Sequence, residues 1–259
     1  IDEDFSKTIQ EGATRFITYN GDRFDEPIIQ RNRFLNLFDP YVTSMHGQQR
    51  MDLLKLIWTL VCFFPEFPRT IDNKGILRCK LENVAANLDI THLNAHDALA
   101  DCKTTLAVLK FIKSNYPDVY YSGLINSSKE GTVAFFENVE PFLVMGEVYR
   151  SPFTNPVVMI SYAQKGNGIA LFNLSFDPSD VVSLSYSEVE KLVHSPQSGP
   201  IKVVQKNKTQ PILPESSVNN LEQHFNISYT ELCRRAKLIK RDEGFKEKVR
   251  KALSSKTYK

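Results

Sequence analysis

The sequence predicts an α/β region followed by a β-rich region with helical additions. Three observations predict this order. A β-rich run at 15–20 is followed by apolar patterns of helical period up to residue 116. Beyond residue 118 the chain changes to short β-branched and aromatic runs separated by turn sequences, and a charged helical pattern closes it. The 259 residues suffice for two ordinary domains, which we place at 1–116 and 118–259.

Composition excludes several classes of protein. Lys and Arg number 32 against 30 Asp and Glu, so the chain lacks the strong overall positive charge that would indicate a nucleic-acid partner. The four cysteines contain no C-x-x-C pair, which argues against a zinc knuckle and a secreted disulfide framework and favours the reducing cytoplasm. The most apolar stretch, 53–64, is well short of the roughly 20 residues that cross a bilayer. We therefore expect a cytoplasmic protein without a membrane partner.

The first region reads as short elements in a clear order. Asp52 is a suitable N-cap for the apolar helix that follows it, and Asp39-Pro40 should end the helix before it. The expected elements are a helix at 4–11, a strand at 15–20, a helix at 28–38 and a helix at 53–64.

Two further helices are expected before residue 117. In the first, Leu81, Val84, Ala85 and Leu88 follow the spacing of one helical face. The second runs over 95–115 and ends at Tyr116-Pro117. Its expected apolar face consists of Ala98, Cys102, Leu106, Leu109 and Ile112.

The second region is expected to be a small antiparallel β unit, either a barrel or a sandwich. A helix should begin near Ser187. Residues 231–259 hold eleven Lys and Arg against four acids, but a helical run of mixed charge is usually a solvated face, and we assign it no site. The expected strands are 133–136, 141–149, 156–163, 168–175 and 201–205.

The string N-A-H-D-A-L-A-D at 94–101 is the sharpest candidate for chemistry. If the helix begins just after His96, Asp101 lies one turn into it, and both side chains can reach one point. A carboxylate fixed on a helix can bind Mg²⁺ or Mn²⁺, and a nearby imidazole can accept a proton from water. The alternative makes Asp97 a helix cap and His96 a surface residue. Taken alone, an H-x4-D pair favours that alternative.

The string Y-N-G-D-R-F-D-E at 19–26 follows the first expected strand. Open α/β sheets bind ligands at the carboxyl ends of their strands, so Asp25 lies where a second metal-binding carboxylate is useful. The alternative gives Asp22 and Asp25 roles only in the turn and the helix cap.

Together these two strings resemble the second and third motifs of the DEDD superfamily of 3′→5′ exonucleases, in its histidine subgroup. The similarity to bacterial exonuclease I is closer still. It is strong over 15–113 and weak after 118, where 207–213 (NKTQPIL) is similar to a loop in that family's SH3-like domain. The blocks that carry it are YNGDRFDE, NLFDPY, RMDLL and LENVAANLDITHLNAHDALADCKTTLAVLKFIK.

The resemblance implies a fold and a site. The fold is α/β: an incomplete ribonuclease H-like exonuclease domain at 1–116, then a β-rich SH3-like domain with helical additions at 118–259. Asp25 and Asp101 are implied as acids of a site for two Mg²⁺ or Mn²⁺ ions, and His96 as the general base. Lys80 stands where the family usually has an arginine that touches the substrate backbone, and lysine lacks that bidentate fork. Tyr41 is a candidate for stacking on single-stranded DNA, with a core aromatic as the alternative.

The family's first motif, an Asp-x-Glu strand that supplies two more carboxylates, should lie well upstream of Asp25. Only 24 residues precede Asp25, and we assign no role to Asp2 or Asp4. We therefore expect a fragment of a longer gene product, truncated at both ends. The chain is then either part of an exonuclease that removes mononucleotides from the 3′ end of single-stranded DNA, or a catalytically incomplete single-stranded DNA-binding module. A third possibility is an RNA-trimming relative. The resemblance implies single-stranded DNA and a single-stranded DNA-binding protein as partners, and a monomer.

Overall fold

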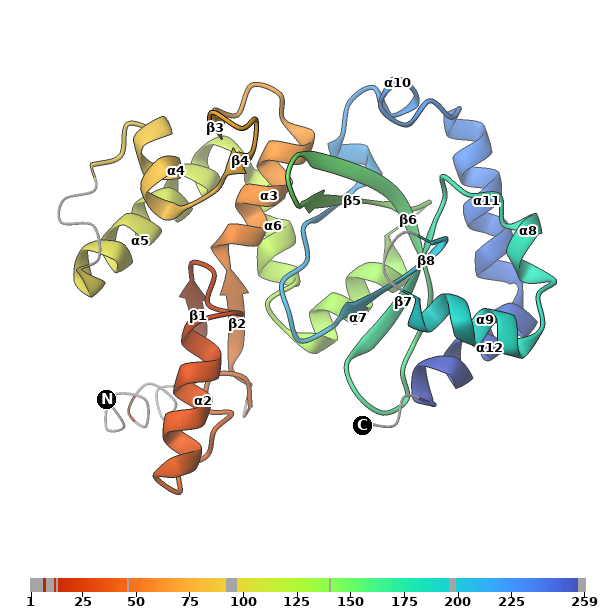
Figure 1. Ribbon diagram of the computed structural model, residues 1–259, viewed down its shortest axis with the longest axis horizontal. Coiled ribbons are helices and arrows are strands. Elements are labelled where there is room, and N and C mark those ends of the chain that lie inside the picture. The colour runs from red at the N-terminus through yellow and green to blue at the C-terminus, as the bar shows by residue number, and fades with distance from the viewer. Residues whose placement is uncertain are drawn as a thin grey trace. The chain divides into compact units, whose positions relative to one another are not determined.

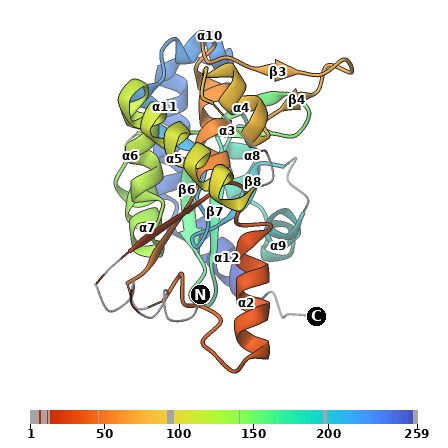
Figure 2. The ribbon, with the colours of Figure 1, turned by 90° about the vertical axis from the view of Figure 1, so that its left-hand side faces the viewer.

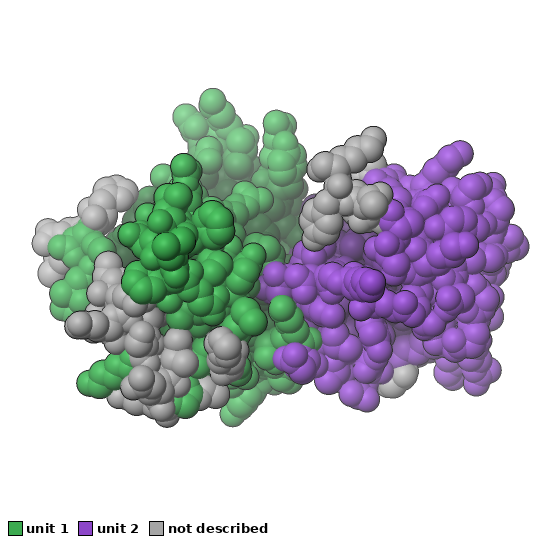
Figure 3. All heavy atoms as spheres, turned by 90° about the horizontal axis from the view of Figure 1, so that it is seen from below, with its two compact units in different colours: residues 1–129, 147–152, 208–211 green, residues 130–146, 153–207, 212–259 purple. Residues whose placement is uncertain are grey.

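The computed structural model describes residues 7, 12, 14–45, 47–91, 97–139, 141–195 and 199–255, and it has a mixed α/β fold (Figure 1). The chain divides into two compact units (Figure 3). The first contains residues 1–129, 147–152 and 208–211, and the second contains 130–146, 153–207 and 212–259. The identities of the two predicted domains stay predictions.

The first unit is built around a parallel pair of short strands. Arg15 pairs with Gln49 and Thr18 pairs with Asp52, so both strands end at the same edge. The strand expected at 15–20 is confirmed in its first four residues, and the helix expected at 4–11 lies almost wholly outside the described residues. The elements are β1 (Arg15–Thr18), α2 (Asp25–Leu35), β2 (Gln49–Asp52), α3 (Leu53–Phe63), β3 (Thr70–Ile71), β4 (Leu77–Arg78), α4 (Leu81–Asn87), α5 (Ala98–Asn115) and α6 (Pro117–Ile125).

Helix α3 is the centre of this unit. Asp52 caps it as predicted, because its carboxylate accepts the backbone N–H of Leu54 at 3.1 Å. Burial of each large aliphatic side chain contributes about 1.5–3 kcal/mol, so this helix anchors the strand ends that precede it. Its buried residues are Leu53, Leu56, Ile57, Thr59, Leu60, Val61 and Phe63.

Helix α6 packs on α3 and α5 within the first unit. Pro117 ends the preceding helix as expected but also starts α6 at a position where a missing N–H costs nothing. A Cβ on Gly123 would lie 2.9 Å from the methyl carbons of Leu56 and 3.0 Å from the sulfur of Met51. The glycine therefore permits the close approach of α6 to α3.

Two helices of the first unit differ from their predicted form. Helix α2 begins at Asp25 and ends at Leu35, three residues earlier at each end than expected; Pro27 is tolerated in its first turn, and Leu37 has a left-handed φ of 62° that prevents continuation. In α5 the predicted apolar face is correct at Leu109 and Ile112, which are buried, but wrong at Ala98, Cys102 and Leu106, which are exposed. Figure 2 shows the β3–β4 hairpin extending away from α4.

The second unit is built on one five-stranded sheet in the order β8-β7-β6-β5-β9. The pairs β5–β9, β6–β7 and β7–β8 are antiparallel as expected, and the strands form a single sheet and not the two sheets of a sandwich. The strands are β5 (Leu143–Val148), β6 (Pro152–Tyr162), β7 (Gly168–Asn173), β8 (Ile201–Gln205) and β9 (Ile212–Pro214).

Helices cover this sheet. Helices α9 and α12 pack on β8 and β7 (Figure 1), and the helix expected near Ser187 is confirmed as α9. The strand predicted at 133–136 is wrong: these residues lie in α7, which buries Phe135 and Phe136 against the sheet. The helices are α7 (Lys129–Asn138), α8 (Ser179–Val182), α9 (Tyr186–His194), the 3₁₀ turn η1 (Glu215–Ser217), α10 (Leu221–Phe225), α11 (Tyr229–Arg241) and α12 (Glu243–Ser254). Across the described part of the chain, no helix combines the length and apolarity needed to span a membrane.

Candidate active site

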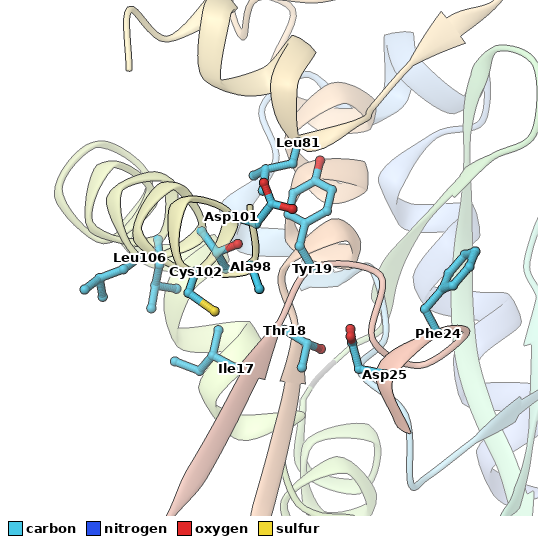
Figure 4. Close-up of a pocket in the computed structure, with 12 residues that line it drawn as sticks. Ile17, Thr18, Tyr19, Phe24, Asp25, Leu81, Ala98, Asp101, Cys102 and Leu106 are labelled. Carbon is cyan, nitrogen blue, oxygen red and sulfur yellow. The ribbon is translucent and has the colours of Figure 1, made fainter. Parts of the chain in front are cut away.

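A pocket of about 630 Å³ in the first unit brings the two predicted metal-binding acids together. Asp25 enters it from the start of α2, and Asp101 enters it from the first turn of α5. In Figure 4 the carboxylate of Asp25 points toward the side of the pocket that holds Tyr19 and Asp101. The end of β1 and the first residue of α4 complete the wall through Thr18 and Leu81.

The turn between β1 and α2 sets the position of Asp25. Asn20 adopts a left-handed φ of 63°, which asparagine tolerates better than most residues. Gly21 has no room for a side chain, since a Cβ there would lie 2.1 Å from the hydroxyl oxygen of Thr18. The backbone N–H of Glu26 donates to the carbonyl of Gly21 at 3.0 Å and closes the turn onto α2. Asp25 itself is exposed on the pocket side.

Glu26 fixes the first turn of α2 through hydrogen bonds to neighbouring segments. Its side chain is buried, with 5% of the residue exposed, and it accepts hydrogen bonds from Arg50 and Thr43, each at 2.8 Å. A buried carboxylate is tolerable only with such partners, and breaking a buried ion pair is strongly destabilising. Through its bond to Arg50, Glu26 links the first turn of α2, where Asp25 lies, to strand β2.

Asp101 is held by the start of α5. The N-cap residue Asp97 accepts the backbone N–H groups of Leu99 at 2.8 Å and Ala100 at 3.1 Å. The backbone N–H of Asp101 in turn donates to the carbonyl of Asp97 at 2.9 Å. The capping role foreseen for Asp97 is therefore real, and it coexists with an Asp101 side chain that faces the pocket.

Tyr19 is a pocket residue for which the sequence analysis proposed no role. Its hydroxyl donates to the carbonyl of Cys79 at 2.5 Å, and this bond joins the end of β1 to the segment that leads into α4. Burial raises the pKa of the Tyr19 hydroxyl far above its ordinary value, and burial also raises the pKa of the Cys79 thiol to about 11. Both groups are therefore neutral near pH 7. The only sequence signal was the position of Tyr19 at the end of a strand.

The other predicted site residues lie as follows. Lys80 immediately precedes α4 next to the pocket residue Leu81, and its exposed ammonium lies 3.5 Å from a Glu82 carboxylate oxygen. Tyr41 is 51% exposed, so it is not the core aromatic of the alternative interpretation, and it does not line the pocket. His96 lies outside the described residues.

The pocket fits a hard divalent cation in the type of donor but not in the number. Carboxylate oxygens are the ligands that Mg²⁺ and Mn²⁺ prefer, and Asp25 and Asp101 supply them on one pocket. Within the described ranges, no three His, Cys, Asp or Glu side chains gather closely enough to hold a metal ion. The described residues therefore supply the type of donor that a divalent cation prefers, but fewer donors than a site for two ions needs.

The chain resembles known proteins in both sequence and fold. No family model matches the chain. Exodeoxyribonuclease I of Escherichia coli is 23% identical over 254 residues, which covers 91% of this chain and 53% of that protein. A solved exonuclease I from Methylocaldum szegediense superposes with a TM-score of 0.77 at 23% identity, over 98% of this chain and 58% of that one.

Two solved structures with bound molecules are also similar. Escherichia coli exonuclease I in complex with a dA16 oligonucleotide gives a TM-score of 0.76 at 21% identity, over 99% of this chain and 59% of that one. A structure of SSB/exonuclease I with the inhibitor CFAM gives 0.73 at 22% identity, over 94% and 54%. The chain spans about half the length of the relatives it matches, and over most of its own length it is homologous to bacterial exonuclease I.

Proposed function

We propose that this chain is part of a metal-dependent exonuclease that hydrolyses single-stranded DNA from its 3′ end and releases mononucleotides. The observation that carries the proposal is the shared pocket of Asp25 and Asp101, which come from separate motifs and separate helices. Homology to exonuclease I and the fold shared with an oligonucleotide complex support the same reaction. In this proposal residues 1–116 belong to a ribonuclease H-like exonuclease domain and 118–259 to an SH3-like domain.

Each proposed site residue has a distinct task. Asp25 and Asp101 would hold Mg²⁺ or Mn²⁺, and the cations would stabilise the attacking and leaving oxygens of the phosphodiester. His96, just before the cap of α5, would accept the proton of the attacking water. Lys80 at the entry to α4 would contact a backbone phosphate as a point charge, and Tyr41 would stack on a base because its ring is exposed.

The proposal includes partners and location. Single-stranded DNA is the substrate, and a single-stranded DNA-binding protein is a second partner, since a solved neighbour is an SSB/exonuclease I structure. We infer a monomer that acts in the cytoplasm.

A cleavage assay tests the proposed reaction. A longer chain in which an Asp-x-Glu strand precedes these residues should shorten a 5′-labelled single-stranded DNA from its 3′ end in Mg²⁺, and should cleave the matched RNA far more slowly. Asp25→Asn and Asp101→Asn should each abolish shortening, while Asp118→Asn, an acid in the first turn of α6, should not. Shortening that survives both site substitutions would contradict the proposal.

One observation favours the alternative, a binding module, for the 259 residues alone. Two carboxylates cannot hold two ions in the arrangement that hydrolysis needs, and no third ligand joins them among the described residues. The chain alone should then bind single-stranded DNA with an affinity that falls as salt rises, with a slope near −0.7 for each phosphate contacted. Binding without cleavage would favour this alternative, and an affinity unaffected by salt would count against it.

A further inference from the structure

A short segment from late in the chain completes the first unit. Residues 208–211 connect β8 to β9, yet they belong to the first unit. The ammonium of Lys208 donates to the backbone carbonyl of Asp22 at 3.2 Å and lies 3.7 Å from a carboxylate oxygen of the same residue. The hydroxyl of Thr209 accepts the backbone N–H of Asp52 at 3.0 Å. Both contacts reach the edge where β1 and β2 end.

Lys208 contacts the turn that precedes Asp25 directly, and Thr209 contacts Asp52, whose carboxylate binds the same turn. The Asp52 carboxylate accepts the backbone N–H of Asn20 at 2.7 Å and, more weakly, that of Asp22 at 3.4 Å. Asp22 is thus held by Asp52 through its N–H and by Lys208 through its carbonyl. The side chain of Asp22 is only 11% exposed, whereas that of Lys208 is 42% exposed. The lysine therefore closes the turn from the solvent side.

The turn has little freedom to compensate for the loss of this contact. Its Asn20 is left-handed and its Gly21 has no room for a side chain beside Thr18, so a rotation of the Asp22 peptide must move the residues after it. Those residues are Arg23, Phe24 and then Asp25, the first residue of α2. The hydrogen bond of Lys208 has a charged donor, and that of Thr209 satisfies a buried N–H, so the loss of either one should loosen this edge.

We propose that Lys208 and Thr209 are positioning residues that fix the turn at Asn20–Phe24 and thereby the place of the Asp25 carboxylate. The role assigned to Asp25 rests on the proposed function, but the hold on the turn does not. On this account residues 208–211, which come late in the sequence but belong to the first unit, support the geometry of a pocket whose lining comes wholly from residues before 110.

Amide hydrogen exchange of the full 259-residue chain tests the hold on the turn. Lys208→Ala should speed exchange of the Asn20 and Glu26 N–H groups about three- to tenfold, while Lys208→Arg should stay near the unsubstituted rate. Lys206→Ala removes the same charge two residues away and is the matched control. Thr209→Val should speed exchange at Asp52, and Thr209→Ser should restore it. The amide of Leu60 in the core of α3 should not change.

Three results would overturn the inference. The first is a rate at Asn20 and Glu26 that is the same in Lys208→Ala and Lys206→Ala. The second is an equal increase at Leu60, which would mean a general loss of stability. The third is faster exchange in the turn with no change in Mn²⁺ affinity, which would separate Lys208 from Asp25. If the unsubstituted chain bound no Mn²⁺, the proposed function would fail, and exchange at Glu26 would still decide whether Lys208 holds the turn.

Discussion

The carboxylate of Asp52 accepts the backbone N–H of Asn20 at 2.7 Å while it caps α3 through Leu54. One side chain therefore joins the end of β2, the start of the central helix and the turn that leads to Asp25. The parallel register, in which Thr18 pairs with Asp52, is what brings the two strand ends within reach.

Two substitutions of Asp52 should distinguish how much its hydrogen bonds and its charge each contribute to stability. Asp52→Ala should lower the free energy of unfolding by about 1–3 kcal/mol, because it removes a cap and leaves the partly buried N–H of Asn20 without this acceptor. Asp52→Asn keeps one acceptor oxygen and should cost clearly less. Urea unfolding of both variants at pH 7 checks this, and equal losses would contradict it.

The same residue should give stability an unusual pH dependence. Burial first, and then the neighbouring Asp22 carboxylate, raise the pKa of Asp52 above 3.8. The folded protein therefore favours the protonated form, and this contribution to stability is fully present below pH 3.8 and lost as pH rises through the raised pKa. Asp52→Asn should lack that loss, which the difference between the two pH–stability curves would reveal.

Gly123→Ala should destabilise the first unit although alanine favours helix. The added methyl would press on Leu56 and Met51, and such overpacking costs about 1–3 kcal/mol against a gain of at most about 1 kcal/mol in helix propensity. Gly244→Ala in α12 is the control, because the nearest atom to its Cβ is 3.4 Å away. Thermal unfolding that ranks Gly123→Ala as the more stable variant would show that α6 does not approach α3 so closely.

Glu231 should stabilise α11 only above acid pH. Hydrogen bonds from Arg234 first, and then from Arg235, lower the pKa of Glu231 to about 2 from 4.5. A lowered pKa means that the contribution is present above pH 4.5 and disappears as pH falls toward 2. Glu231→Gln should therefore flatten the dependence of the free energy of unfolding on pH over that range. A free energy of unfolding that falls equally steeply with acid in Glu231→Gln and in the unsubstituted chain would refute this prediction.

His96 should behave differently from the two acids in a protein that contains the first motif. His96→Ala should slow cleavage roughly 10²–10⁴-fold with little change in DNA affinity, and extra metal should not rescue it. Losses in Asp25→Ala and Asp101→Ala should be partly rescued by metal. Only a neutral imidazole accepts a proton, so cleavage should rise with pH through about 6–7. Normal cleavage by His96→Ala would make it a surface residue at the helix entry.

The sequence predicted elements whose signal is local and missed those that depend on tertiary contacts. Asp52 before an apolar run is a local cap signal, and it proved correct. The run at 133–136 has strand-like composition, but burial of Phe135 and Phe136 against a sheet made largely of later residues makes it helical. Leu106 continues an apolar period along α5 yet lies at a pocket, which periodicity cannot distinguish from a core.

The candidate site shows the same division. Asp25 and Asp101 were identified by motif and family resemblance, since neither spacing alone excluded ordinary capping roles. The contact of Lys208 with Asp22 could not be foreseen, because it joins residues 186 positions apart through a turn between two strands. Tyr19 was visible as a strand-end residue, but its bond to Cys79 depends on how the β4–α4 segment folds back over β1.

Mn²⁺ binding to the 259-residue chain, followed by electron paramagnetic resonance, tests the central claim most directly. We predict weak binding that is lost in Asp25→Asn and in Asp101→Asn and kept in Asp118→Asn, because only the first two acids line the pocket. Mn²⁺ binding that is unchanged in both pocket variants, or two tight sites in the unsubstituted chain, would contradict the assignment of Asp25 and Asp101 as the metal-binding acids of this part of an exonuclease.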